Sequence, residues 1–411
     1  MLVVSARIRK SDDCIDLIMQ TVVLAAGEGT RMRPLTETTP KPMLPVVGRP
    51  LVEHTVRATV EAGTDELVLV VGYEADEVRD YFGDSYAGVP IRYAVQSERD
   101  GTASALRAAS EHLDDRFAVV NGDIVYEPAS LSDLFDAGPG VGTTRVEEPS
   151  NYGILDVENG VVTGIVEKPD DPPGTLANAG AYVFPERALE YLDVPKSERG
   201  EYELTDVLSR LIEDTSVGHV ALADWLDVGR PWELLEANAR RLRGLEPDVR
   251  GEVSPDATLE GPVVVEEGAT VRSGVVLEGP VVVRSGATVG PNAYVRGPTV
   301  VGEGASIGHA VEIKHSVLMA GAGVNHLSYV GDSVLGRNVN LGAGTTVANL
   351  RHDDEPVRAT VKGERVSTGR RKFGVVVGDG VKTGINTSLN AGVLLSAGTT
   401  TGPGEVVTRD R

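Results

Sequence analysis

The sequence predicts two architectures in one chain: an α/β domain with a Rossmann-like, mostly parallel sheet, followed by a left-handed parallel β-helix. Up to about residue 245, short apolar runs alternate with stretches of helical spacing. From Val253 to Met319, an apolar residue recurs at every sixth position. The composition changes at the same place, because 45 acidic and 24 basic residues precede position 251, whereas 16 and 15 follow it.

The 411-residue chain is longer than a single domain usually grows. We predict a disordered or misassigned extension over residues 1–18, the α/β domain over residues 19–248 and the β-helix over residues 249–411. The first segment is charged and lacks the apolar core of a signal peptide, and Met19 directly precedes a strong strand. The single cysteine, Cys14, excludes an intrachain disulfide and favours a reducing compartment. No apolar run is long enough to span a membrane, so we expect a cytoplasmic protein.

The net charge of −22 excludes some classes of partner. Nucleic acids and anionic membranes are bound through basic surfaces, so we expect neither as a partner. Only 8 of the 39 basic residues are lysines. A strongly acidic, lysine-poor composition is typical of a protein kept soluble in high salt, which gives the hypothesis of a halophilic source.

The strands and helices of the α/β domain follow from the residue pattern. Mostly apolar runs predict buried strands at residues 21–26, 67–71, 91–95 and 117–121. Helical spacing between the strands predicts helices at residues 50–62 and 102–112. In sheets built this way, ligands bind beyond the carboxyl ends of the strands.

The loop after the first predicted strand is rich in glycine and carries two cations. Gly27 and Gly29 let backbone N–H groups approach an anion, while Arg31 and Lys41 add positive charge. The spacing is neither that of a P-loop nor that of the dinucleotide fingerprint. Lys41 lies between two prolines, which would hold it rigidly.

Residues 24–42 read L-A-A-G-x-G-T-R-M-x-P-L-T-x-x-x-P-K-P, and this run resembles the signature of the sugar-1-phosphate nucleotidylyltransferases. Further segments match that family in the same order along the chain. They are Gln96 with Gly101-Thr102, Asn121–Asp123, Tyr152-Gly153, Glu167–Pro169, Asn178–Gly180 and Trp225–Gly229.

The resemblance implies that a sugar 1-phosphate oxygen attacks the α-phosphorus of a nucleoside triphosphate and that pyrophosphate leaves. It assigns Mg²⁺ to Asp123 and Asp227, the triphosphate to Arg31 and Lys41, and the sugar phosphate to Lys168. It also implies a set of substrate contacts: Leu24, Ala25, Ala26, Gly27, Gly29, Thr30, Gln96, Gly101, Thr102, Gly153, Glu167, Lys168 and Asn178.

Without the family resemblance, three of these residues could equally have structural roles. Asp123 follows Asn-Gly and could be a turn residue, and Asp227 could cap the helix that begins near Pro231. Lys168 could be an exposed loop cation.

The β-helix is predicted from a repeat of six residues. Its apolar positions are Val253, Leu259, Val265, Val271, Leu277, Val283, Val289, Val295, Val301, Ile307, Ile313 and Met319. Each such residue would point into a triangular prism whose coils contain 18 residues. The repeat slips around residues 320–335, resumes at Leu335, and is the place where we expect a loop to leave the coil and build a site.

The slip contains His326, and the residues around it resemble the acetyltransferase site of the bifunctional glucosamine-1-phosphate acetyltransferase/N-acetylglucosamine-1-phosphate uridylyltransferases. The matching residues are Arg296, Lys314, His326, Tyr329, Asn340 and Asn349. The resemblance implies that His326 is the general base that activates an amine for attack on acetyl-CoA. Arg296, Lys314 and Tyr329 would hold the sugar phosphate, and Asn340 would orient the sugar. Ala343 and Asn349 would meet the acetyl-CoA side, with the site lying between the subunits of a homotrimer.

Departures from the pattern of the bacterial members leave the grip on acetyl-CoA open. Glu355 stands where the bacterial pattern brings a lysine, although Arg358 lies nearby. Ile385 replaces a serine in the last coils, and residues 356–373 look like an insertion of archaeal-type relatives.

The favoured function is therefore a two-site enzyme that acetylates glucosamine 1-phosphate and joins the product to UTP or dTTP. The alternative is a glucose-1-phosphate thymidylyl- or uridylyltransferase whose β-helix only mediates oligomerisation. His326 and Lys314 distinguish the two, because a scaffold needs neither. Gln96 and Gly101 serve uracil and thymine alike, so the base stays open.

Overall fold

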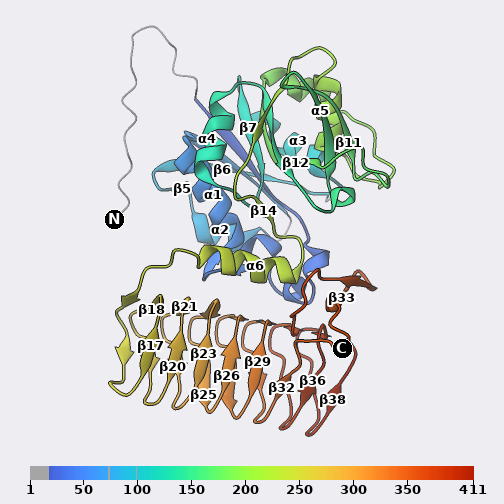
Figure 1. Cartoon of the computed structure of the whole chain (residues 1–411). Coiled ribbons are helices and arrows are strands. Elements are labelled where there is room, and N and C mark those ends of the chain that lie inside the picture. The colour runs from blue at the N-terminus through green and yellow to red at the C-terminus, as the bar shows by residue number, and fades with distance from the viewer. Residues whose placement is uncertain (1–17, 73–74, 99) are drawn as a thin grey trace.

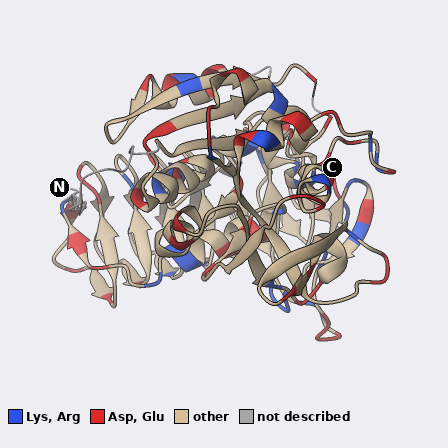
Figure 2. Cartoon of the chain, turned by 90° about the horizontal axis from the view of Figure 1, so that it is seen from above, with Lys and Arg blue, Asp and Glu red and all other residues tan. Residues whose placement is uncertain are grey.

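The computed structural model describes residues 18–72, 75–98 and 100–411, and shows an α/β part lying along one side of a long coil (Figure 1). The predicted extension over residues 1–18 lies outside the described residues except for Ile18, and so does Cys14. Seen from above, Asp and Glu residues are scattered over helices and loops of both parts instead of gathering on one face (Figure 2). None of the helices in the described ranges is both long and apolar enough to cross a membrane.

The centre of the α/β part is a parallel sheet with the strand order β6-β4-β1-β7. These strands are β1 (Gln20–Ala25), β4 (Glu66–Val71), β6 (Val89–Val95) and β7 (Phe117–Asn121). The two faces of this sheet form separate apolar cores, in which the helices take part. The helices are α1 (Leu51–Ala62), α2 (Asp76–Phe82), α3 (Thr102–Ala109), α4 (Pro128–Asp136) and α5 (Leu204–Leu211).

The prediction of a mostly parallel sheet is wrong for the second half of this part. The whole sheet has ten strands, and beyond β7 most pairings are antiparallel. One of these pairings is the hairpin of β10 (Gly153–Glu158) and β11 (Val161–Glu167), whose turn has positive φ at both Asn159 and Gly160, and the others join strands distant in the sequence. The remaining strands are β5 (Ser85–Tyr86), β9 (Gly140–Arg145), β12 (Leu176–Phe184) and β13 (Gly218–Ala221).

His54 on α1 predicts how the stability of this part depends on pH. Burial lowers the pKa of His54 to about 4, and its Nε2 lies 3.0 Å from the carbonyl oxygen of Val46. Below pH ~6.5 the unfolded chain therefore binds a proton that the folded chain does not. We expect this group to lower the free energy of unfolding by about 2 kcal/mol between pH 7 and pH 5. In urea titrations His54→Gln should remove this part of the pH dependence, whereas the exposed His352→Gln should not.

After α6 (Pro231–Arg241), the chain winds through three parallel sheets in turn, and from β15 to β29 each strand pairs with the strand three places later. The first sheet contains β15 (Asp248–Val249), β18 (Val263–Val265), β21 (Val281–Val283), β24 (Thr299–Val301), β27 (Val317–Leu318), β30 (Val334–Leu335), β35 (Val376–Val377) and β37 (Leu394–Leu395). The second contains β16 (Glu252–Val253), β19 (Thr270–Val271), β22 (Thr288–Val289), β25 (Ser306–His309), β28 (Gly323–His326) and β31 (Asn340–Leu341). The third contains β17 (Thr258–Glu260), β20 (Val276–Glu278), β23 (Tyr294–Arg296), β26 (Glu312–Lys314), β29 (Tyr329–Gly331), β32 (Thr346–Val347), β36 (Ser388–Leu389) and β38 (Val406–Val407). This arrangement is consistent with a β-helix.

The repeated apolar residues line one continuous core inside the coil, with one exception. Met319 is not part of that core, and Leu318 takes the position instead. The reason is the corner at His315, which has a φ of 44° and is one residue shorter than the corners before it. Val301 then pairs with Leu318, and Leu318 with Leu335, so these two coils contain 17 residues each.

The expectation of a loop leaving the coil at residues 320–335 is therefore wrong. The strands there stay in register, and the change of spacing comes from shortened corners. The chain leaves the coil later, through a hairpin of β33 (Arg358–Val361) and β34 (Glu364–Ser367).

An apolar cluster joins the two parts of the chain. Helix α6 lies over the first sheet of the coil, and the ring of Trp232 meets that of Phe373 edge to face at 6.0 Å (Figure 1). Met32 and Leu35, from the loop after β1, belong to the same cluster. The glycine-rich loop is thus held next to the coil. The short pair β2 (Pro45–Val46) and β3 (Arg49–Pro50) flanks this region.

Candidate functional sites

The loop after β1 brings Lys41 towards the centre of the α/β part. Gly29 has a φ of 68°, and a Cβ there would lie 2.7 Å from the Cβ of Lys41. Only glycine therefore allows the loop to pass this closely. Lys41 is 6% exposed, and its ammonium group forms an ion pair with Asp123.

Two carboxylates meet beside this lysine. Strand β8 (Ile124–Val125) pairs antiparallel with β14 (Leu226–Asp227), and the N–H of Val228 donates to the carbonyl of Asp123 at 3.0 Å. Burial acts to raise the pKa of Asp123, but attraction to Lys41 outweighs it and leaves that pKa below its usual range. Burial, followed by repulsion from Asp123, raises the pKa of Asp227. The carboxylates of Asp123 and Asp227 therefore repel each other.

A divalent cation would relieve this repulsion. Mg²⁺ prefers carboxylate oxygens and usually takes its other ligands from water and substrate phosphates. No group of three or more His, Cys, Asp or Glu residues suited to a metal occurs within the described ranges. Asp123 and Asp227 thus fit a cation shared with a phosphate ligand, and not one enclosed by protein alone.

A cavity of about 220 Å³ opens beside the two carboxylates. Eight of the residues predicted as site residues line it: Arg31, Thr102, Asp123, Gly153, Glu167, Lys168, Asn178 and Asp227. The predicted contacts from Leu24 to Thr30, together with Lys41, Gln96 and Gly101, are not among its lining residues. Glu201 and Glu203 also line it, although no motif singled them out.

Gln96 and Gly101 form a neighbouring unit that backbone geometry keeps in place. The Gln96 side chain is 5% exposed and donates from Nε2 to the carbonyl of Gly101 at 2.9 Å. A Cβ at Gly101, where φ is 128°, would lie 2.2 Å from the carbonyl oxygen of Tyr202. Thr102 accepts a hydrogen bond from the N–H of Leu204 at 3.0 Å. These contacts pack the segment of residues 96–102 against that of residues 202–204.

The opposite wall of the cavity holds a charged pair and an amide. Lys168, at a φ of 43°, lies 3.2 Å from a carboxylate oxygen of Glu167. A Cβ at Gly153 would lie 2.8 Å from a carboxylate oxygen of Glu167, so a larger residue there would displace that side chain. Asn178 donates from Nδ2 to the hydroxyl of Tyr182 at 2.6 Å. A polar, partly charged wall of this kind suits a sugar phosphate.

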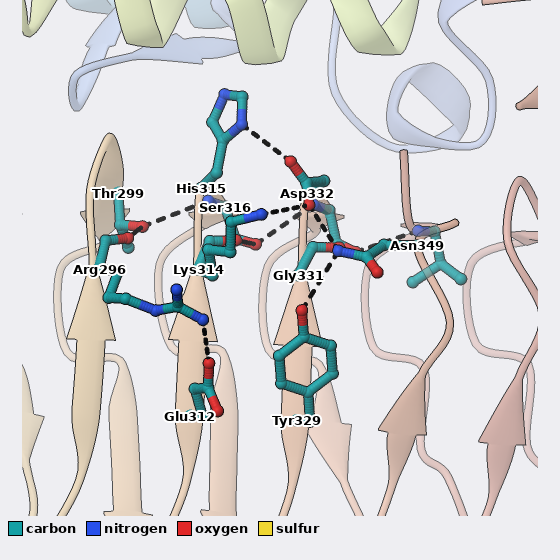
Figure 3. Close-up of polar contacts among 12 residues, drawn as sticks. Arg296, Thr299, Glu312, Lys314, His315, Ser316, Tyr329, Gly331, Asp332 and Asn349 are labelled. Carbon is teal, nitrogen blue, oxygen red and sulfur yellow. Dashed lines mark hydrogen bonds and ion pairs between the residues drawn. The ribbon is translucent and has the colours of Figure 1, made fainter. Parts of the chain in front are cut away.

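A second polar cluster lies on neighbouring strands of the coil (Figure 3). Arg296 and Lys314 occupy equivalent positions of β23 and β26, because the strands pair in register. Arg296 forms an ion pair with Glu312, and Lys314 lies 3.3 Å from Asp332. Asn349 donates to the hydroxyl of Tyr329 at 3.2 Å. The coil thus brings together four residues that the sequence spaces over 54 positions.

Asp332 is the centre of this cluster, and the sequence analysis missed it. It is 2% exposed and accepts hydrogen bonds from Lys314, from His315 Nδ1 at 2.9 Å and from Asn349 at 2.6 Å. Burial acts to raise the pKa of Asp332, but these three partners outweigh it and lower that pKa. Its only sequence signal is Gly331-Asp332 at a shortened corner.

Replacing Asp332 should destabilise the coil. Asp332→Asn removes the charge that balances Lys314 and replaces one of the two acceptor oxygens with a donor, at a cost of about 3 kcal/mol. Asp353→Asn is the matched control, because Asp353 also pairs with an arginine but is exposed. Urea unfolding measures both, and equal midpoints for the two variants would contradict this role of Asp332.

His326 lies apart from this cluster in the single chain. It ends β28 at an exposed corner, in register with His309 one coil earlier. Within the described residues, no hydrogen bond or ion pair engages its ring. Asn340 and Ala343 follow on the next coil and are likewise not part of the cluster around Asp332. Leu327, beside His326, is 66% exposed.

Two family models match the chain. A nucleotidyl transferase model matches residues 20–244, and the model of a GMPPB C-terminal domain matches residues 277–399. The bifunctional protein GlmU of Methanocaldococcus jannaschii is 41% identical over 396 residues, which cover 95% of each chain. The bifunctional sugar-1-phosphate nucleotidylyltransferase/acetyltransferase of Sulfurisphaera tokodaii is 36% identical over 400 residues, which cover 95% of this chain and 98% of that one. A crystal structure of UDP-glucose pyrophosphorylase with UDP-glucose matches 56% of this chain and 100% of its own, with a TM-score of 0.50 and 26% identity.

Proposed function

This chain belongs to the family of bifunctional sugar-1-phosphate nucleotidylyltransferase/acetyltransferases, and on that premise we propose that it makes a nucleoside-diphosphate N-acetylamino sugar in two reactions. Acetyl-CoA acetylates the amine of glucosamine 1-phosphate and free CoA leaves. The phosphate of the product then attacks the α-phosphorus of UTP, or of dTTP, and pyrophosphate leaves. The observation that carries the proposal is the presence of two separate polar sites in one chain, each with cations suited to a phosphate.

The nucleotidyl transfer is assigned to the cavity beside Asp123 and Asp227. Both substrates are anions, so the site acts by neutralising charge and by holding the attacking oxygen in line. Arg31 and Lys41 bind the triphosphate, and Lys168 binds the sugar phosphate. Mg²⁺ bound by the two carboxylates would neutralise phosphate charge. The predicted contacts of Leu24, Ala25, Ala26, Gly27, Gly29, Thr30, Gln96 and Gly101 belong to the nucleotide side.

The acetyl transfer is assigned to the cluster around Asp332 together with His326. Arg296, Lys314 and Tyr329 hold the sugar phosphate, and Asp332 keeps Lys314 in place. His326 takes a proton from the substrate amine while the amine nitrogen forms a bond to the thioester carbon of acetyl-CoA. Asn340 orients the sugar, and Ala343 and Asn349 face the acetyl-CoA.

We also propose that the coil is a left-handed β-helix beginning at residue 249, after a nucleotidyltransferase domain over residues 19–248, and that three chains assemble through it. Two observations support a homotrimer. His326 is separated from the phosphate-binding cluster in one chain, and Leu327 and Ile385 are exposed apolar residues, at 66% and 55%, on the same part of the coil. A neighbouring copy would cover these side chains and complete the site. A cytoplasmic, high-salt setting remains a prediction.

Two assays on the purified chain test the function. One measures CoA release from acetyl-CoA with glucosamine 1-phosphate, and the other measures pyrophosphate release from UTP or dTTP with N-acetylglucosamine 1-phosphate. We expect both. Pyrophosphate release with glucose 1-phosphate but no CoA release would favour the alternative of an enzyme whose coil is only a scaffold.

A further inference from the structure

A second and larger cavity, of about 490 Å³, lies between the two parts of the chain. One side is formed by the glycine-rich loop and the segment after it, and the other by the β33–β34 hairpin and the last coil, which lie next to each other in Figure 1. The residues that matter for its charge are Arg31, Arg33, Glu37, Lys362, Asp410 and Arg411.

Most of these charges are already engaged. Glu37 accepts a hydrogen bond from the N–H of Ala397 at 2.7 Å, and Asp410 accepts one from the N–H of Leu394 at 2.9 Å. Arg33 pairs with Glu28 at 3.3 Å, and Arg411 pairs with Glu405.

Two cations in the cavity remain without a partner. Among the described residues, neither Arg31 nor Lys362 forms a hydrogen bond or an ion pair through its side chain. Arg31 comes from the α/β part and Lys362 from the coil, so each part contributes to the same cavity one cation that no close ion pair neutralises, although Arg31 also acts through space on Asp123 and Asp227. Two such groups together favour a bound anion.

Lys362 lines the cavity in a strained, left-handed backbone conformation. Lys362 and Gly363 form the two-residue turn of the hairpin, with φ values of 49° and 86°. Turns of this type favour Asn, Asp or Gly at the first position, because a larger side chain is strained in the left-handed region. The hairpin is fixed to the coil, since Arg365 donates to the carbonyl of Gly392 at 3.0 Å. A lysine is thus held at a defined point in a chain that has only eight.

Arg31 connects this cavity with the nucleotide site, because it also lines the smaller cavity beside Asp123 and Asp227. We propose that Lys362 of the coil, together with Arg31, binds the terminal phosphates of the nucleoside triphosphate and the pyrophosphate that leaves. The inference rests on the proposed nucleotidyl transfer and adds to it a substrate contact from the other half of the chain. A β-helix hairpin then completes the polyphosphate end of the site.

The test compares Lys362→Gln with Lys372→Gln in the full-length chain. Lys372 is an exposed lysine in the same excursion of the chain and does not line the cavity. At saturating sugar 1-phosphate, Lys362→Gln should raise the KM for the nucleoside triphosphate about tenfold. It should raise the inhibition constant of inorganic pyrophosphate by the same factor. The KM for sugar 1-phosphate and the rate of CoA release should not change, Lys362→Arg should restore part of the affinity, and Lys372→Gln should match the wild type.

The outcomes separate this inference from the function on which it rests. If the wild-type chain releases no pyrophosphate, the proposed nucleotidyl transfer itself is contradicted. An active wild type with an unchanged Lys362→Gln variant overturns only the role of Lys362. Inhibition by pyrophosphate that depends on Lys362 but does not compete with the nucleoside triphosphate would place a separate anion in the cavity, and would also overturn the proposal.

Discussion

Replacing His326 with alanine should lower the rate of CoA release by about 10²- to 10⁴-fold, the range that a positioned general base contributes. The ring of His326 is exposed and has no hydrogen-bond partner among the described residues, so no neighbouring group blocks its approach to a substrate amine. Pyrophosphate release from a preformed N-acetylated sugar 1-phosphate should keep its wild-type rate. The two assays on one variant therefore measure whether the two sites work independently.

His309→Ala is the matched control for this experiment. His309 occupies the same corner one coil earlier and is in register with His326. If exposure and corner position alone mattered, both variants would lose activity. We expect the His309 variant to keep CoA release, and size-exclusion chromatography should give the same assembly for both variants. Equal activity of the His326 variant and the wild type would remove His326 from the mechanism.

Replacing Asp123 with asparagine should lower pyrophosphate release by about 10³-fold or more and leave CoA release unchanged. The change removes the charge that Lys41 balances and one of two carboxylates that fit Mg²⁺. Asp227→Asn should have a similar effect, because the pairing of β8 with β14 places both carboxylates at one point. Both variants should need more Mg²⁺ for their residual activity.

The control is Asp133→Asn, an exposed carboxylate on the nearby helix α4. It should release pyrophosphate at the wild-type rate over the same range of Mg²⁺ concentration. A normal rate for the Asp123 variant would count against the metal assignment. A loss in all three variants would point to bulk charge instead of a defined site.

Most of the coil could be predicted from the sequence because its interactions repeat along the chain. Each apolar residue from Val265 to Ile313 points into the same core, so the period of six is visible without knowing which strands pair. The prediction failed at Met319, where the corner at His315 shortens the coil by one residue. A one-residue change at a turn alters which side chain faces the core, but it leaves little trace in composition.

The parts of the sites that lie on one loop were also visible in the sequence. Gly29, Arg31 and Lys41 are close along the chain, and their residue types already indicate an anion site. Asp332 was not visible, because its importance depends on three partners brought by separate strands and on its burial. The antiparallel half of the α/β sheet could not be predicted for the same reason, since strand direction is decided by long-range pairing.

The sequence by itself determined the repeat of the coil, the order of the motifs in the α/β part and the residue types that phosphate chemistry needs. These features depend on local spacing and on the chemistry of single side chains. Only the tertiary structure decided the network around Asp332 and the cavity that Arg31 shares with Lys362. Arg31 and Lys362 are more than 300 positions apart, and the contact between α6 and the coil that brings them to one cavity depends on how two finished surfaces pack.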